Sequence, residues 1–308
     1  MSLPVDIGTL HLEHPVLNGS GTFDAIAARR AFGETAWERF PFSAFVSKTI
    51  TPEPRSGNPP PRLSETPAGL INSIGLPNRG LEGFLAADLP QLAALPVPLV
   101  VSVMATSHDG FARLVRAVGS RPEVEAVELN VSCPNVESGL MIGERPEETL
   151  ALVEALRSLT DQALIVKLTP NVADPAAVAL AAEAGGADAV SLVNTIRATA
   201  VDPEAGTPRL GAGSGGLSGA AIRPIALQQV RRVAAAVSLP VVGMGGIESG
   251  ADALAFIDTG ASAVAVGTAS FRDPLAGQRI RRELDRALAR RQGERAATQP
   301  APAGSTSS

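Results

Sequence analysis

The sequence predicts a single (β/α)8 barrel, one of the α/β folds. Eight short apolar runs recur along its 308 residues, and a helical pattern follows most of them. A barrel of this kind takes about 250 residues as one unit. No Gly-x-Gly-x-x-Gly nucleotide fingerprint follows the first run, which disfavours an open sheet of the dinucleotide-binding type. We therefore expect one domain with strands and helices in strict alternation.

The apolar runs are the expected strands. They are short and rich in Val, Leu, Ile and Ala, as strands buried on both faces are. In chain order they cover residues 15–17, 44–47, 99–103, 126–129, 163–166, 189–193, 240–242 and 263–266.

The segments between the runs have helical spacing or helix-end residues. Residues 147–159 place leucine and valine at intervals of three, which fits one face of a helix. Asp174 followed by Pro175 is typical of an N-cap and the first helical position. Further helices are expected over residues 176–184, 222–237 and 249–259, and a basic helix from Asp273 onward.

Two excursions interrupt the alternation. Residues 51–78 are rich in proline and glycine, and residues 197–218 are long and glycine-rich. We expect structureless loops above the C-terminal face of the barrel, since long loops in compact domains are usually lids or binding loops. The barrel domain should occupy residues 1–291, and the polar stretch 292–308 should be a disordered tail.

Composition excludes several classes of protein. A net charge of −5 offers no reason to expect a nucleic acid or an anionic membrane as partner. A single cysteine excludes an intrachain disulfide and a Cys-only metal or iron–sulfur site, and the three histidines have no metal-binding spacing. No apolar stretch approaches the length of about 20 residues that spans a bilayer, and no signal-peptide core is present. We expect a cytoplasmic protein without a metal.

Polar residues follow the expected strands and should converge, because the C-terminal strand ends of a barrel form one rim. Gly245-Gly246 after the seventh strand and Gly267-Thr268 after the eighth lie where barrels commonly bind phosphate through backbone N–H groups. They could alternatively serve tight turns only. The side chains collected at the rim are Ser20, Lys48, Asn130, Cys133, Lys167, Asn194 and Thr195.

Lys167 ends an apolar strand, where a charge is costly unless it is paired. It is either a fixed cation beside a cofactor ring or a lysine that reaches solvent. Glu128 and Asn130 share one side of their strand, so we expect Glu128 to pair with a rim lysine. Four asparagines, at 72, 130, 135 and 194, suit the amide edges of a pyrimidine-like substrate, although each could also stabilise a turn.

Six motifs together resemble the class 1 dihydroorotate dehydrogenase family, and most closely the catalytic subunit of its NAD-linked type, class 1B. They occur in the family's order and span about residues 18–274. The motifs are NSIGLPN at 72–78, NVSCPNV at 130–136, VKLTPN at 166–171, GGLSG at 215–219, GMGGI at 243–247 and VGTA at 266–269.

The resemblance implies an FMN-containing barrel that oxidises dihydroorotate to orotate in pyrimidine biosynthesis. Cys133, which alone would more often be an inert buried residue, becomes the base that takes the C5 proton while hydride passes from C6 to the flavin. The implied FMN contacts are Ser20, Lys48, Thr49, Asn130, Lys167, Val193, Gly219, Gly245, Gly246, Gly267 and Thr268. The implied substrate contacts are Lys48, Asn72, Ser73, Ile74, Gly75, Leu76, Asn130, Asn135, Asn194 and Thr195.

The NAD-linked type also implies a partner. A separate subunit with FAD and a [2Fe-2S] cluster would pass electrons to NAD, and a homodimer core with that subunit would form a heterotetramer. The alternatives are a homodimer that uses fumarate, the same flavin chemistry on a dihydropyrimidine base, and a phosphate-binding barrel without redox chemistry. The last is disfavoured because a phosphate site needs neither the cysteine nor the lysines.

Two departures from the family pattern stand near the implied site. Ser102 occupies a position on the third strand where an asparagine that contacts the flavin is usual. After Thr195 the chain continues Ile-Arg-Ala-Thr at 196–199, where the family normally has an apolar Gly-Met pair.

Overall fold

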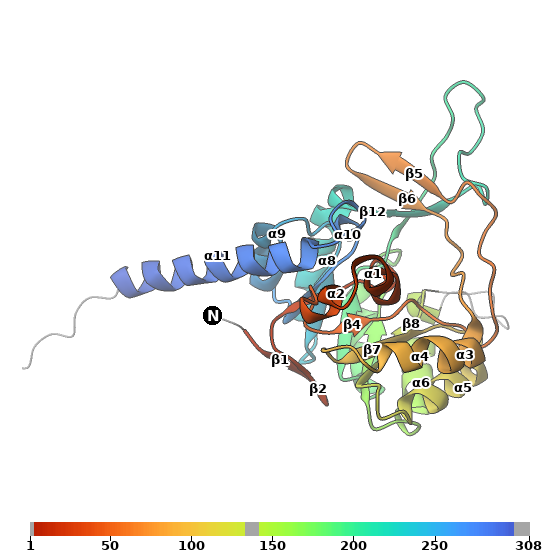
Figure 1. Ribbon diagram of the computed structural model, residues 1–308, viewed down its shortest axis with the longest axis horizontal. Helices are drawn as coiled ribbons and strands as arrows, with labels where there is room; N and C mark the ends of the chain where they lie inside the picture. Colours follow the sequence, from red (N-terminus) through yellow and green to blue (C-terminus); the bar gives the residue numbers. More distant parts are fainter. Residues whose placement is uncertain (1–2, 133–141, 299–308) are drawn as a thin grey trace, which may run out of the picture.

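The computed structural model describes residues 3–132 and 142–298, and its centre is an eight-stranded parallel barrel. From the second barrel strand onward, each strand pairs with the next in chain order, and the last pairs with the first (Figure 1), whereas no ladder joins the first strand to the second within the described residues. All eight predicted strands are confirmed. They are β3 (Val16–Asn18), β4 (Phe45–Val46), β7 (Leu99–Val103), β8 (Ala126–Asn130), β9 (Ala163–Lys167), β10 (Ala189–Leu192), β13 (Val241–Met244) and β14 (Ala263–Val266).

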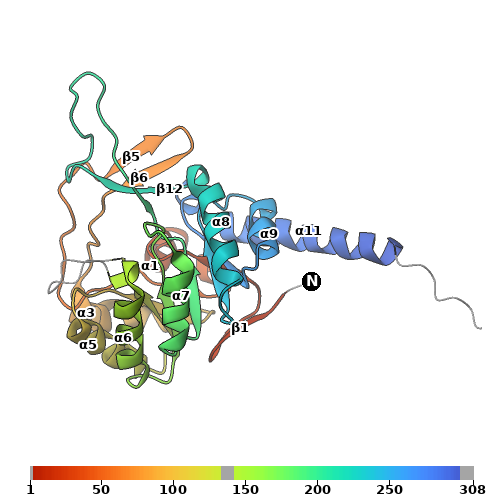
Figure 2. The same ribbon diagram turned by 180° about the vertical axis from the view of Figure 1, so that it is seen from behind.

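Helices cover the outside of the barrel, and those predicted from the sequence are present (Figure 2). The side chain of Asp174 accepts a hydrogen bond from the Ala176 N–H, which confirms the predicted N-cap. The main helices are α5 (His108–Gly119), α6 (Pro146–Arg157), α7 (Pro175–Ala184), α8 (Arg223–Ala234), α9 (Gly250–Asp258) and α11 (Ala276–Thr298). Shorter ones are α1 (Ala25–Phe32), α2 (Thr35–Glu38), α3 (Gly80–Gly83), α4 (Leu89–Leu92), α10 (Ala269–Arg272) and the turns η1 (Phe84–Asp88), η2 (Ile142–Glu144) and η3 (Ala220–Ile222).

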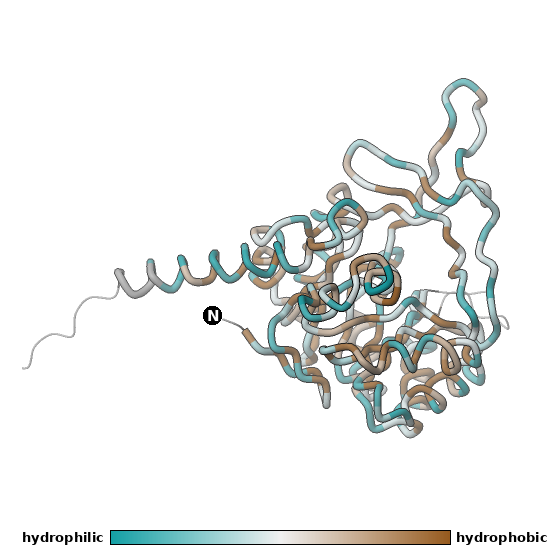
Figure 3. The backbone as a smooth tube through the Cα atoms, in the orientation of Figure 1, coloured by the Kyte–Doolittle hydropathy of each residue, from teal (hydrophilic) through white to brown (hydrophobic). Residues whose placement is uncertain are grey.

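Two apolar clusters divide the core. The larger lies between the strands and the helices, and the smaller fills the barrel interior. The strands β1 (Val5–Ile7) and β2 (Leu10–Leu12) form a hairpin whose apolar side chains belong to the interior cluster. The hairpin closes the end at which the strands begin, since Thr9 accepts a hydrogen bond from the N–H of Ala163. The hydrophobic segments accordingly gather in the body of the barrel (Figure 3).

The ring closes between β3 and β4 through one side chain. Asn18 is fully buried; its Oδ1 accepts from the Val46 N–H at 2.9 Å, and its Nδ2 donates to the Val46 carbonyl at 2.8 Å. The Ser43 N–H adds a bond to the Val16 carbonyl. The amide of Asn18 thus substitutes for a backbone peptide group, and the buried N–H and C=O of β4 are satisfied.

The two excursions are not structureless, and that expectation was wrong. They form an antiparallel sheet in the order β11 (Ile196–Ala198), β12 (Gly215–Ser218), β6 (Gly69–Asn72), β5 (Leu63–Thr66). Glycines permit the close strand approach, because a Cβ on Gly215 would lie 2.2 Å from the Asn72 carbonyl oxygen. The sheet lies at the C-terminal strand ends as predicted, with Ser218 bonded to Thr268 after β14 (Figure 1).

The C-terminal helix extends further than predicted. The disordered tail was expected from residue 292, whereas α11 continues to Thr298 and projects away from the barrel (Figure 1). Glutamine, glutamate, arginine and alanine in this stretch favour helix despite Gly293. Within the two described ranges, no helix combines the length and apolar character needed to cross a bilayer.

His14 is buried at the start of the barrel. Its Nδ1 accepts from the Val16 N–H at 3.3 Å, and its own N–H donates to the Ser43 hydroxyl. Burial, and secondarily the positive charge of Arg281, lower the pKa of His14 from 6.5 to about 4. His14 is therefore neutral in the folded protein at neutral pH.

A neutral buried His14 should make stability depend on pH. The unfolded chain binds this proton more tightly, so the stabilising contribution is complete above pH 6.5 and is lost as the pH falls toward 4. We expect a loss on the order of 2 kcal/mol in the free energy of unfolding between about pH 7 and about pH 5 from this group. His14→Asn keeps an acceptor for Val16 and should lack that loss. Urea denaturation of both proteins at both pH values measures it; equal losses would contradict the assignment.

Candidate functional site

The only two lysines in the chain, Lys48 and Lys167, lie at the C-terminal rim of the barrel. All other basic side chains, apart from three histidines, are arginines. Lysine differs from arginine in being a compact, titratable ammonium group. The sequence itself carries this signal, although none of the motifs depends on it. It singles out the rim as the place where a lysine is specifically required.

Lys167 is held by a buried carboxylate. Its Nζ lies 3.8 Å from Oε1 of Glu128, and the two residues are 6% and 4% exposed. The Ser102 hydroxyl donates to Oε1 of Glu128, and the Ser191 hydroxyl donates to Oε2, each at 3.1 Å. The predicted pairing of Glu128 with a rim lysine is confirmed. A charge in this environment is tolerated because it is both paired and hydrogen-bonded.

Lys48 lies near Lys167 and is partly buried. Burial, followed by the positive charge of Lys167, lowers the pKa of Lys48 below its ordinary value of 10.5. Gly21 has a φ of +69°, and a Cβ there would lie 2.7 Å from Cδ of Lys48. The glycine therefore leaves the space that the lysine side chain occupies.

A chain of hydroxyl groups joins the first βα loop to Glu128. The Ser20 Oγ lies 2.9 Å from Oγ1 of Thr49, which lies 2.9 Å from Oγ of Ser102. Ser102 then donates to Glu128. Ser102 and Ser191 were not among the predicted site residues. The register that places Ser102 opposite Glu128 connects them, and no sequence motif marks that register.

Two of the four predicted asparagines converge. Nδ2 of Asn194 donates to Oδ1 of Asn130 at 3.3 Å and to the Ser132 hydroxyl at 3.0 Å. Asn130 lies beside Lys167 in the strand register. Oδ1 of Asn194 accepts from the N–H of Thr195. These amides therefore reach the same part of the rim as the lysines.

The remaining predicted substrate contacts lie in the excursion sheet and the loop after it. Asn72 ends β6 and donates to the Gly216 carbonyl at 3.2 Å, which holds β12 in place. The Ser73 hydroxyl accepts from Asn58, and the loop continues through Ile74, Gly75 and Leu76. No bond from Asn72 to Asn130 or Asn194 is found in the described part of the chain. Cys133 and Asn135 lie outside the described residues.

The glycine clusters meet at one place on the rim. A Cβ on Gly246 would lie 2.7 Å from the Gly219 carbonyl oxygen, so the two loops touch through their backbones. Gly245 and Gly246 have φ values of +127° and +79°, which favour glycine. A Cβ on Gly267 would meet a single atom, Cγ2 of Thr22 at 3.7 Å, so open space lies beside it. Buried Val193, beside Gly245, completes the predicted set.

The Ile-Arg-Ala departure forms strand β11. The Arg197 N–H donates to Oδ1 of Asn171 at 3.0 Å, and its guanidinium pairs with Glu144. Nδ2 of Asn171 donates to the Thr195 carbonyl. These bonds fix the segment that follows Asn194 against the barrel.

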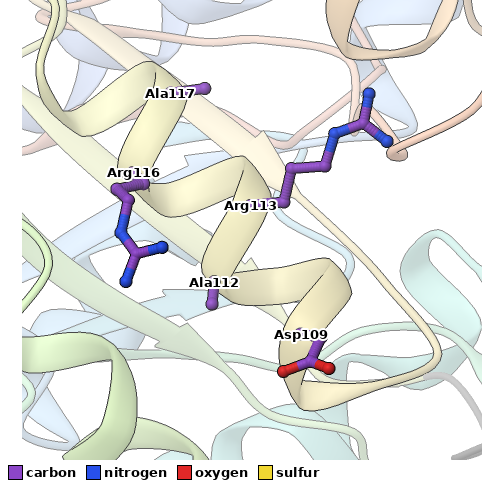
Figure 4. A pocket seen from close by; sticks show the side chains of 5 residues that line it. All are labelled: Asp109, Ala112, Arg113, Arg116 and Ala117. Atoms are coloured by element: carbon purple, nitrogen blue, oxygen red, sulfur yellow. The ribbon is translucent and has the colours of Figure 1, made fainter.

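Other surface features of the described chain do not bring together polar side chains from several strands as the rim does. A hollow on the outer face of α5 is lined by Asp109, Ala112, Arg113, Arg116 and Ala117 (Figure 4). Arg113, one of these lining residues, is already paired with Glu53 at 2.7 Å. Within residues 3–132 and 142–298, no group of three His, Cys, Asp or Glu side chains is placed to hold a metal.

Comparison with known proteins assigns the chain to a family. The family model described as dihydroorotate dehydrogenase matches residues 2–288. The chain belongs to the dihydroorotate dehydrogenase family. It is 43% identical over 294 residues to a protein of Trichlorobacter lovleyi, with 94% of each chain covered, and 45% identical over 291 residues to one of Desulforudis audaxviator, with 92% of each covered. Both, and a Listeria innocua protein 39% identical over 290 residues with 93% of each covered, are named dihydroorotate dehydrogenase B (NAD(+)), catalytic subunit.

The charge of Lys167 should contribute, after burial, to the lowered pKa of Lys48. Lys167→Met removes the repulsion, so the pKa of Lys48 should rise toward 10.5, with the effect of burial left in place. Lys167→Arg keeps the charge and should leave the lowered value largely unchanged. Selective ¹³C labelling of lysine followed by NMR titration resolves the question, because the chain has only two lysines. An unchanged titration in Lys167→Met would contradict the proposed coupling.

Proposed function

We propose that this chain is the catalytic subunit of an NAD-linked dihydroorotate dehydrogenase, which oxidises (S)-dihydroorotate to orotate in pyrimidine biosynthesis. The observation that carries the proposal is the convergence of the only two lysines with Asn130 and Asn194 beside a glycine-built cradle. The names of relatives that match more than nine-tenths of the chain support the same reaction.

The rim residues fit FMN. Backbone N–H groups of the loops at Gly245, Gly246, Gly267 and Thr268 suit a phosphate, and the space beside Gly267 leaves room for one. Lys167 would supply a fixed cation to the flavin ring, and Asn130 an amide. Ser20, Lys48, Thr49, Val193 and Gly219 complete the proposed cofactor site. FMN, when bound, supplies the acceptor for the hydride that leaves C6 of dihydroorotate.

The chain's own residues have separate tasks in this proposal. Lys48 binds the substrate carboxylate, and Asn72, Asn130, Asn135 and Asn194 bind the polar edges of the pyrimidine ring. Backbone and side-chain groups of residues 73–76 and of Thr195 complete the substrate site. Cys133 takes the C5 proton on its sulfur, for which its thiol must first be ionised. The excursion sheet above the rim limits access of water to the reacting groups.

The electrons then leave through a partner subunit. The relatives' names include both NAD(+) and catalytic subunit, which favours this route over fumarate. With one cysteine, the chain cannot itself hold a [2Fe-2S] cluster with four thiolates. We propose a homodimer core that binds a subunit carrying FAD and the cluster, giving a heterotetramer.

An anaerobic titration tests the reaction. The purified protein should carry one FMN per chain, whose visible absorbance is lost on addition of dihydroorotate and is unaffected by dihydrouracil. Bleaching by dihydrouracil alone would move the protein to the dihydropyrimidine alternative. A protein that binds no FMN on reconstitution would contradict the proposal outright.

The matched variant is Cys133→Ala. It should bind FMN normally, and orotate should still perturb the flavin spectrum, while bleaching by dihydroorotate slows by about 100-fold or more, as for loss of a general base. Bleaching at the wild-type rate would remove Cys133 from the mechanism.

A further inference from the structure

Glu128 is a buried carboxylate at the centre of the rim network, and the proposed reaction gives it no task. It is 4% exposed and lies in the middle of β8, above the apolar interior of the barrel. An unpaired carboxylate in such a place would be strongly disfavoured. Its retention calls for a specific role.

The carboxylate of Glu128 contacts side chains of the rim network. Oε1 receives the Ser102 hydroxyl and lies 3.8 Å from Nζ of Lys167, while Oε2 receives the Ser191 hydroxyl. Ser102 stands opposite Glu128 in the register of β7 and β8, and Ser191 stands opposite Lys167 in the register of β9 and β10. Three strands thus fix one carboxylate, whose only cationic partner in the described chain is Lys167.

The carboxylate also orients the hydroxyl chain. An ionised carboxylate only accepts hydrogen bonds, so the Ser102 proton is directed to Glu128. The Thr49 hydroxyl must then donate to Ser102, and Ser20 donates to Thr49 or to the Ser47 carbonyl. Because the hydroxyl protons of Ser20 and Thr49 are donated to groups within the protein, these two hydroxyls can only accept hydrogen bonds from a ligand. The floor of the site accepts hydrogen bonds there.

Glu128 also changes the net charge of the site. Two ammonium groups and one carboxylate leave one net positive charge at the rim. Without Glu128, Lys167 would act on the site with its full charge, and the hydroxyl chain would have no anion to orient it. Ser102 matters here because a hydroxyl can both accept from Thr49 and donate to Glu128.

We propose that Glu128 is a positioning residue that fixes Lys167, partly offsets its charge at the proposed FMN site, and orients the Ser102–Thr49–Ser20 hydroxyls as acceptors. The inference rests on the proposed function, because it concerns the same FMN site. Its consequence is a lower flavin midpoint potential than Lys167 alone would set.

Glu128→Gln tests the charge. Removal of one negative charge leaves the reduced, more negative flavin better stabilised by Lys167, so the midpoint potential should rise. We expect a change on the order of tenfold in the equilibrium ratio of reduced to oxidised flavin, about 30 mV for a two-electron couple. Anaerobic titration of the holoprotein against a reference dye measures it. An unchanged or lower potential would overturn the proposal.

Glu128→Asp is the matched control. It keeps the charge in a shorter side chain, so its potential should stay near the wild-type value, whereas a purely structural role predicts that Asp and Gln shift the potential alike. Equal shifts in the two variants would therefore count against the proposal.

A second variant covers the case in which Glu128→Gln does not fold. Ser102→Ala removes one donor from the carboxylate and leaves its charge, so the midpoint potential should fall, opposite in sign to the effect of Glu128→Gln. A Ser102→Ala protein with the wild-type potential would contradict the proposed hydroxyl chain. Failure of the wild-type protein to bind FMN would instead defeat the proposed function, so the two failures are distinguishable.

Discussion

The closure of the barrel depends on the buried amide of Asn18. Strand β4 is only two residues long, and Asn18 satisfies both the N–H and the C=O of Val46 from the opposite strand. This pair of hydrogen bonds brings the first βα loop beside the second, so that Ser20 reaches both the Ser47 carbonyl and Thr49. The hydroxyl chain of the site begins at this junction. A ring that failed to close here would separate Lys48 from the glycine loops that follow β13 and β14.

Within the closed ring, the arrangement of charge follows from the cost of burial. The interior is apolar below the rim, so Lys167 and Glu128 can be retained only together and with hydroxyl partners. Lys48, which has no such partner in the described chain, has a pKa lowered by burial and by Lys167. This arrangement thus presents a fixed cation and a more easily deprotonated one side by side. The proposed function assigns Lys167 to the flavin ring and Lys48 to the carboxylate of the pyrimidine.

The sequence predicted those features that depend on local pattern. Buried parallel strands are apolar runs, so all eight were found, and alternation along β8 placed Glu128 on the side of Asn130 and predicted its pairing with a lysine. The links through Ser102 and Ser191 depend on register between strands distant in sequence, which no local pattern specifies. The excursion sheet was missed because its strands are short and because β6 and β12 contain glycine, which is depleted in strands. Helix α11 extends beyond its expected end because helix-forming residues continue past residue 291.

In the proposed function, one molecule of FMN and one of orotate occupy this rim together, over the Lys167–Glu128 pair. A crystal structure of the protein with both bound tests it most directly. The phosphate should lie against the loops at Gly246 and Gly267, the flavin ring against Lys167 and Asn130, and the orotate carboxylate at Lys48. FMN found elsewhere on the protein, or orotate bound away from Lys48, would contradict it.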